Sequence, residues 1–181
     1  MLRLLIIAVF AIFFTACSQL DIKIDYDTEY EFSKEIKYTV VHSSRVGDDT
    51  LTNDRIKKAL QNTLDLKGYT MVEQKDADVL FVFHADVKDK TDIQTDYQMV
   101  GFGGYGFARG FGGGMVATTS AYNYTEGTLV VDALNPDTQK ILWRGIATDE
   151  LSKKDATPEE KSAYINVVVS KLINNFPREA K

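Results

Sequence analysis

The sequence is poor in the residues that most often build metal sites and disulfides. It has one cysteine, Cys17, and two histidines, His42 and His84, which lie far apart along the chain. One cysteine cannot form a disulfide within the chain, and two histidines without H-x-x-x-H spacing do not indicate a zinc site. The sequence also lacks a G-x-S-x-G elbow and a G-K-[ST] phosphate loop. We therefore expect no metal, no cofactor and no catalytic residue.

Long runs of basic residues are absent as well. The 21 lysine and arginine residues are outnumbered by 26 aspartate and glutamate residues, which gives a formal net charge of −5. Because nucleic acids and anionic lipid head groups attract basic surfaces, a chain this acidic is a poor candidate for binding either of them. We expect no nucleic-acid partner.

The N-terminus reads MLRLLIIAVFAIFFTAC. A single charge at Arg3 precedes an apolar run from Leu4 to Phe14, and two small residues follow, which is the layout of a secretory signal. The apolar run is about half the roughly 20 residues that a membrane-spanning helix needs. A cleaved signal is therefore favoured over a retained transmembrane helix.

The segment F-T-A-C, with its cysteine at Cys17, resembles the bacterial lipobox, in which the cysteine becomes acylated. Leucine is usual where this sequence has Phe14; the alternative is an ordinary secretory signal with an incidental cysteine. Two or more acyl chains suffice for stable membrane anchoring. We predict a signal peptide over residues 1–16, a lipidated Cys17 with a tether over 17–20, and one domain over 21–181. Ser18 favours the outer membrane, with the protein facing the periplasm.

Periodicity in the mature chain predicts a mixture of strands and helices. Alternation with period two predicts strands over residues 21–32 and 37–42, an apolar run predicts a central strand over 79–87, and N-P-D-T predicts a hairpin between 128–134 and 140–148. Helical spacing predicts helices over 53–67, capped by Thr52 or Asn53 and stopped at Gly68, and from Pro158, with a Thr157–Glu160 capping box. The order favours an α+β fold: one mixed or mainly antiparallel sheet with two helices packed on one face, and a Gly/aromatic-rich loop insertion.

Several segments together resemble a family of bacterial lipoproteins, domain of unknown function 4136. The most specific are G-T-L-V-V-D at residues 127–132 and W-R-G at residues 143–145, with K-G-Y at 67–69 as support. The resemblance covers nearly the whole mature chain. It implies a lipid-anchored envelope domain with a glycine- and aromatic-rich insertion, and it implies no known reaction, substrate or catalytic residue.

The insertion GFGGYGFARGFGGG occupies residues 101–114, and its start satisfies the dinucleotide pattern G-x-G-x-x-G. A dinucleotide loop leads into a helix, and the glycines that follow here disfavour one. The insertion could instead be a contact surface, with aromatic rings and one cation for stacking on a partner, or a loosely packed hairpin tip. The candidate surface residues are Phe102, Tyr105, Phe107, Arg109 and Phe111.

These features favour a lipid-anchored envelope protein that acts by binding or assembly and not by catalysis. Its expected contacts are the membrane, through acyl chains on Cys17, and an envelope protein or a glycan. A periplasmic binding module for a small ligand or a glycan is the alternative, and a hydrolase is a third possibility. The sequence leaves the oligomeric state open.

Overall fold

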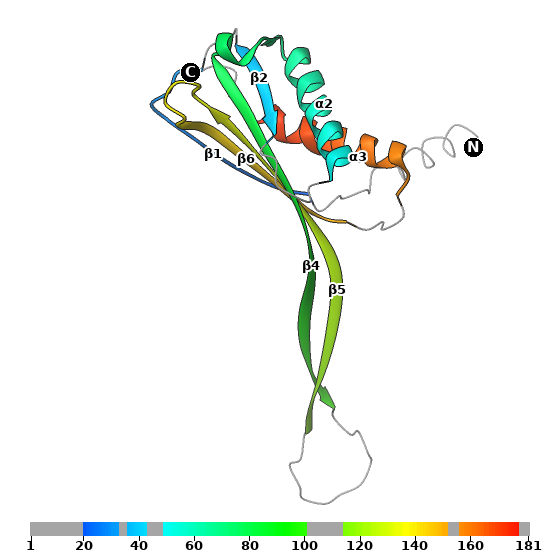
Figure 1. Cartoon of the computed structure of the whole chain (residues 1–181). Coiled ribbons are helices and arrows are strands. Elements are labelled where there is room, and N and C mark those ends of the chain that lie inside the picture. The colour runs from blue at the N-terminus through cyan, green and yellow to red at the C-terminus, as the bar shows by residue number, and fades with distance from the viewer. Residues whose placement is uncertain (1–19, 33–35, 43–48, 101–113, 152–155, 178–181) are drawn as a thin grey trace, which may run out of the picture.

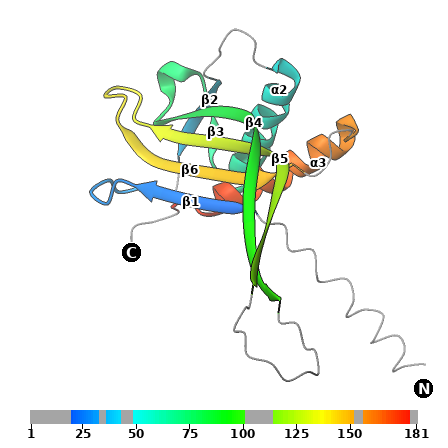
Figure 2. The same cartoon turned by 90° about the horizontal axis from the view of Figure 1, so that it is seen from below.

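The computed structural model describes residues 20–32, 36–42, 49–100, 114–151 and 156–177, with the side chains of 97–100 and 114–116 outside the description. The described residues form one six-stranded mixed sheet with two α-helices on one of its faces (Figures 1 and 2). The predicted α+β fold is therefore confirmed. Along the chain the elements are β1 (Asp21–Tyr26), β2 (Lys37–His42), α2 (Thr50–Leu66), β3 (Thr70–Met71), the 3-10 helix η2 (Gln74–Asp76), β4 (Val79–Val100), β5 (Gly114–Leu134), β6 (Ile141–Glu150) and α3 (Pro158–Asn174).

The sheet has the strand order β1-β6-β5-β4-β2-β3. Strand β2 runs parallel to β3 and β4, and the remaining pairs are antiparallel. The first two strands are therefore not neighbours, since β1 forms one edge and β2 pairs near the other. The predicted strand over residues 21–32 is wrong beyond Tyr26. A turn follows there, in which the backbone N–H of Glu29 donates to Asp27 Oδ1 at 3.0 Å.

Both helices begin at side-chain caps. Asp49 accepts hydrogen bonds from the backbone N–H groups of Leu51 and Thr52, so α2 begins three residues before the predicted start and its cap is neither Thr52 nor Asn53. The predicted stop is confirmed, because Gly68 has a φ of +87°, which favours glycine. The Thr157–Glu160 capping box of α3 is confirmed as well, with Pro158 at the first helical position.

The core lies between the helices and the sheet and is centred on aromatic rings. Phe176, just after α3, makes edge-on contacts with Phe32, Phe81 and Trp143 at ring-centroid distances of 5.2, 5.2 and 5.3 Å. Tyr69 contacts the same ring at 6.1 Å. The side chain of Trp143 is fully buried in this core.

The hairpin predicted around N-P-D-T is confirmed, because β5 and β6 pair from Glu126↔Glu150 to Leu134↔Ile141. Asn135 orders the turn, with its Oδ1 accepting from the backbone N–H groups of Asp137 and Thr138. The strands were nevertheless predicted too short. Strand β4 continues to Val100 and β5 begins at Gly114, which gives them 22 and 21 residues.

Gly145 is required by the packing of Trp143. A Cβ at this position would clash with the Trp143 ring and would lie 2.8 Å from Leu172 Cδ1 on α3. We expect Gly145→Ala to destabilise the fold by about 1–3 kcal/mol, the usual cost of overpacking a core. The matched control is Gly127→Ala, whose Cβ would have the side chain of Leu151 as its nearest neighbour, at 3.1 Å. Urea unfolding measures both, and equal midpoints for the two variants would contradict this packing.

The α2 cap makes stability depend on pH. The Thr52 hydroxyl donates to Asp49 Oδ2 at 2.6 Å, and this bond is the main cause of a lowered Asp49 pKa. A lowered carboxyl pKa adds stability above the ordinary value of 3.8, and this stability is lost as the pH falls further. We expect Asp49→Ala to cost about 1 kcal/mol at neutral pH and less at about pH 3.

Urea unfolding at both pH values tests this expectation. The control is Asp54→Ala, which removes an exposed acid from the same helix. A cost for Asp49→Ala that is the same at both pH values would show that ionisation of Asp49 does not contribute.

Candidate functional site

The β4–β5 hairpin runs far beyond the sheet. Strand β6 pairs with β5 only from Glu126 onward, and β2 pairs with β4 only up to Phe83, whereas β4 and β5 stay paired out to Val100↔Gly114. We call the projecting part, residues 88–100 of β4 with 114–126 of β5, the ribbon (Figure 1). At about 3.3 Å per residue it is about 40 Å long. Among the described residues no helix and no third strand covers it beyond Glu126, and near its base the Tyr122 hydroxyl donates to Glu150 Oε1 of β6 at 2.7 Å.

Polar side chains on the ribbon form hydrogen bonds with one another across the two strands. On one face the Thr91 hydroxyl donates to Asn123 Oδ1 at 2.7 Å, and the Thr125 hydroxyl donates to Asp89 Oδ1 at 2.7 Å. On the other face the rings of Tyr122 and Tyr124 stack at 6.0 Å. Residues 87–96 and 117–123 are all exposed. The ribbon thus has cross-strand polar contacts but no buried core of its own.

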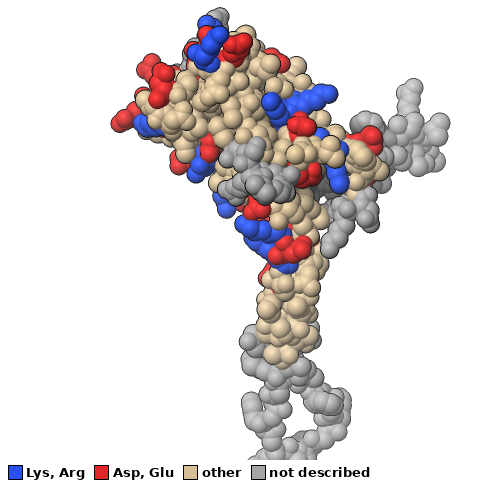
Figure 3. Space-filling model, in the orientation of Figure 1, with Lys and Arg blue, Asp and Glu red and all other residues tan. Residues whose placement is uncertain are grey.

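Charge on the ribbon is confined to its base and to β4. On the face drawn in Figure 3, acidic and basic side chains gather where the ribbon leaves the body, and the described part farther along is uncharged. Asp92 and Asp96 add charge on β4 beyond the base. In the sequence from Tyr97 to Thr125, Arg109 is the one charged residue. Residues 114–125 of β5 can therefore approach another surface without removing their own charges from water.

The candidate surface residues Phe102, Tyr105, Phe107, Arg109 and Phe111 lie in residues 101–113, outside the described part of the chain. The structure places this segment between the ends of β4 and β5. The element after the glycines is a strand and not a helix, so the helix N-terminus that a dinucleotide loop requires does not follow the G-x-G-x-x-G pattern. The segment therefore joins two strands, as predicted.

A cleft of about 880 Å³ opens between the helices and the sheet at the base of the ribbon. Its sheet side carries small residues, Ala85, Gly127 and Ala147, whereas large rings fill the opposite end of the same face. Its helix side carries Ile56 of α2 and Val168 of α3. The cleft exists because these small residues leave the ends of the helices without large partners.

Titratable groups around the cleft have shifted pKa values with structural causes. Burial raises the pKa of Tyr164, whose hydroxyl also donates to Asp149 Oδ2 at 2.7 Å. The Lys88 ammonium lowers the pKa of Asp86, which it contacts at 2.7 Å, and Asp49 serves as the α2 cap. These groups are occupied in holding the fold, and the remaining lining is mainly apolar, which suits binding.

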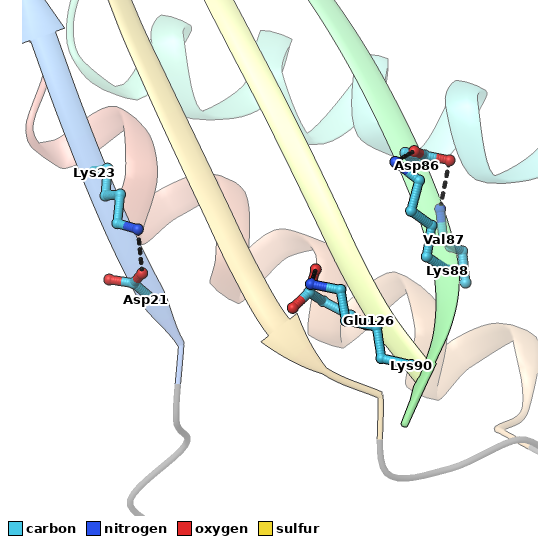
Figure 4. Close-up of polar contacts among 7 residues, drawn as sticks. All are labelled: Asp21, Lys23, Asp86, Val87, Lys88, Lys90 and Glu126. Atoms are coloured by element: carbon cyan, nitrogen blue, oxygen red, sulfur yellow. Dashed lines mark hydrogen bonds and ion pairs between the residues drawn. The ribbon is translucent and has the colours of Figure 1, made fainter. Parts of the chain in front are cut away.

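The opposite face of the sheet has a smaller hollow of about 300 Å³ at the same level. His84 and Thr128 line it, and two ion pairs border it: Asp86 with Lys88, and Lys90 with Glu126 at 2.6 Å (Figure 4). His84 Nδ1 is buried and has no hydrogen-bond partner within the described part of the chain. The Lys90–Glu126 pair links β4 to β5 where the ribbon leaves the sheet, whereas Asp86 and Lys88 both lie on β4.

Leu20, the first described residue, lines the helix-side cleft together with Val87 and Gly127 at the base of the ribbon. The next residue, Asp21, pairs with Thr148 near the end of β6. The polypeptide that precedes the domain therefore joins it at the end of the sheet from which the ribbon leaves. Sequence reasoning missed this proximity, because β1 meets the ribbon end only through long-range pairing.

The two most specific sequence segments of the chain face each other on β5 and β6. Asp132 is in register with Arg144, whose guanidinium donates to both carboxylate oxygens at 2.6 and 2.7 Å, and Val131 is in register with Gly145. These segments build the centre of the sheet. Their role in this structure is to hold the fold.

The two histidines do not meet. His42 lies at the end of β2 with its ring 4.8 Å from Phe83, on the helix face, and His84 lines the hollow on the other face. Over the described ranges no group of three or more His, Cys, Asp or Glu side chains has the arrangement of a metal site. None of the described helices is both long and apolar enough to cross a membrane.

Solved structures with a similar fold include a PDZ domain protein from Parabacteroides distasonis, at a TM-score of 0.53 and 11% identity. That match covers 97% of this chain, which spans only 40% of the other protein, and such low identity shows similarity of fold alone. A DUF4136 family protein from Bacteroides thetaiotaomicron matches at a TM-score of 0.42 and 12% identity, over 88% of this chain and 96% of the other. The PelC dodecamer from Paraburkholderia phytofirmans matches at a TM-score of 0.47 and 8% identity, over 90% of this chain and 99% of the other.

Comparison with curated proteins gives no match. The sequence profile described as "Domain of unknown function (DUF4136)" matches residues 22–178, from β1 to just beyond α3. The matched range contains the whole sheet except its first residue, both helices and the ribbon. The chain therefore belongs to the DUF4136 family.

Proposed function

We propose that this protein is a lipid-anchored component of the bacterial envelope that binds a partner in or at its own membrane through the ribbon and its tip. The observation that carries the proposal is the ribbon itself: two strands that extend about 40 Å beyond the sheet with no covering layer among the described residues. A two-stranded hairpin is marginally stable in water, so a long one is best explained by a partner that covers it.

The position of Leu20 supports a partner close to the membrane. A tether from Cys17 to Asp21 spans at most roughly 15 Å, at about 3.3–3.6 Å per residue. Since Leu20 and the base of the ribbon line the same cleft, an anchor on Cys17 would hold the base of the ribbon near the membrane surface. The proposed location is the outer membrane, facing the periplasm.

The composition of the tip supports binding through aromatic contacts. Phe102, Phe107 and Phe111 lie between the two strands of the ribbon in the sequence, together with Tyr105 and Arg109. Aromatic and arginine side chains are enriched at the energetic centres of protein interfaces, and aromatic rings also stack on sugars. We assign the tip to a protein partner of the envelope, and a glycan is the alternative occupant.

A second candidate function is a binding module for a small apolar ligand, which the helix-side cleft favours. Its volume lies within the usual range for ligand sites, about 300–1,000 Å³, and Ile56, Leu129 and Val168 line it. This function does not use the tip. It is favoured over the first proposal if tip substitutions leave every partner of the protein in place.

Anchoring through Cys17 is tested by Cys17→Ala. We expect this change to abolish palmitate labelling and to release the protein from the membrane fraction, because the acyl chains and not charge would hold it there. Ser18→Ala is the matched control and should keep both properties. Persistence of labelling and membrane association in Cys17→Ala would refute the anchor.

Binding through the tip is tested by replacing Phe102, Phe107 and Phe111 together with serine in the full chain. A ring at the centre of an interface contributes about 2 kcal/mol or more to binding. Because the loss of one such contact lowers affinity at least about tenfold, we expect the yield of crosslinked envelope partner to fall at least about tenfold. The control replaces three exposed apolar residues of the body, Tyr26, Leu66 and Met71, with serine. Unchanged crosslinking after the tip substitutions, measured in intact cells, would exclude the tip as the contact.

A further inference from the structure

The outer edge of β5 along the ribbon is a long unpaired strand edge. From Gly114 to Tyr124 the strand pairs with β4 on one side, and no other described strand lies on its second side. The free edge ends at Thr125, whose carbonyl accepts from the backbone N–H of Leu151 at 2.8 Å. The backbone groups along this edge are therefore available for strand pairing.

This edge lacks the features that usually protect a strand edge from pairing. Natural edges carry charged residues, proline or bulges, or are short. Residues 114–124 read GMVATTSAYNY, with no charge and no proline, and the register with β4 is unbroken along them. The opposite edge of the ribbon, on β4, carries Lys88, Asp89, Lys90, Asp92 and Asp96. The ribbon is thus protected on one edge and open on the other.

The sequence at the centre of the open edge is nearly the same in both directions. Residues 117–121 read A-T-T-S-A, with Thr119 in the middle. Paired antiparallel with an identical strand, Thr119 faces Thr119, Thr118 faces Ser120, and Ala117 faces Ala121. Such hydroxyl pairs are favourable across strands, and a two-fold symmetric contact requires this reciprocity.

We propose that the β5 edge of one molecule pairs antiparallel with the β5 edge of a second copy, centred on Thr119, to form a four-stranded ribbon. The pairing converts a marginal two-stranded ribbon into a sheet of four strands, with the charged β4 strands outside. The inference rests on the ribbon that the proposed function uses but not on its tip, which stays free to bind a different partner.

Cysteine crosslinking tests the pairing in the full chain carrying Cys17→Ala, in which an added cysteine is the only thiol. Directly opposed residues in an antiparallel pair lie about 4.5–5.5 Å apart between Cα atoms, within reach of a disulfide. We expect Thr119→Cys to form a disulfide dimer on mild oxidation. The control is Thr95→Cys, which lies opposite Thr119 on β4 with its hydroxyl 3.4 Å away, and it should remain monomeric. Equal crosslinking of the two variants, or none with Thr119→Cys, would overturn the pairing.

A charge substitution gives a second readout. Ser120→Lys places like charges diagonally across the proposed pair, and we expect it to weaken dimerisation up to about fivefold in light scattering or sedimentation. Gln94→Lys is the matched control, because Gln94 is in register with Ser120 and puts the same charge on the same face of the ribbon, but on β4. A dimer that survives Ser120→Lys, or is lost equally with Gln94→Lys, would contradict the pairing.

The experiments can refute either of the two proposals without refuting the other. If the tip substitutions leave partner crosslinking unchanged while Thr119→Cys still forms the dimer, the self-pairing stands and the tip proposal falls. If Thr119→Cys stays monomeric while the tip substitutions remove the partner, the self-pairing falls and the tip proposal stands.

Discussion

The ring of Phe176 holds α3 against the sheet, and the rest of the structure is arranged around that contact. It meets edge-on rings from β4 and β6 and from the segments that follow β1 and α2, at centroid distances of 5.2–6.1 Å. Each such pair adds about 0.5–1.5 kcal/mol beyond the apolar area it buries. The large rings lie at one end of the sheet, and small residues line the helix-facing side of the other end. The cleft, the entry of the chain at Leu20 and the base of the ribbon all lie at that second end.

The ribbon is not covered by helices in the way that the sheet of the body is. In the body one face of the sheet is covered by α2 and α3, whereas beyond Glu126 no described helix or third strand covers the ribbon. Its backbone hydrogen bonds are open to water, so its local stability is expected to be far below that of the core strands. A partner along its edge or at its tip would supply the missing contacts. The proposed function therefore uses the ribbon and not the body as its contact element.

Local signals in the sequence were sufficient for most of the body. Capping residues around Thr157, the period-two pattern of 37–42 and the N-P-D-T turn each specify a structure through neighbours in the chain. Pairing of β1 with β6 was not predictable, because no local sequence feature specifies which strands pair with each other. The extension of β4 beyond Val87 was missed because its Lys–Asp alternation has no apolar face, the feature that identifies a half-buried strand. Threonines and tyrosines over 118–125 carried the available signal, since these residues favour strands without requiring burial.

Hydrogen exchange along β4 and β5 tests the role of the ribbon most directly. The amides to compare are those of the ribbon and those of the body strands around Phe81 and Val131, in dilute purified protein and in native membranes. If the ribbon is the contact element, its amides exchange much faster than the body amides in dilute solution and become protected in membranes, while the body is unchanged. Equal and unchanged protection of ribbon and body in both preparations would contradict that role.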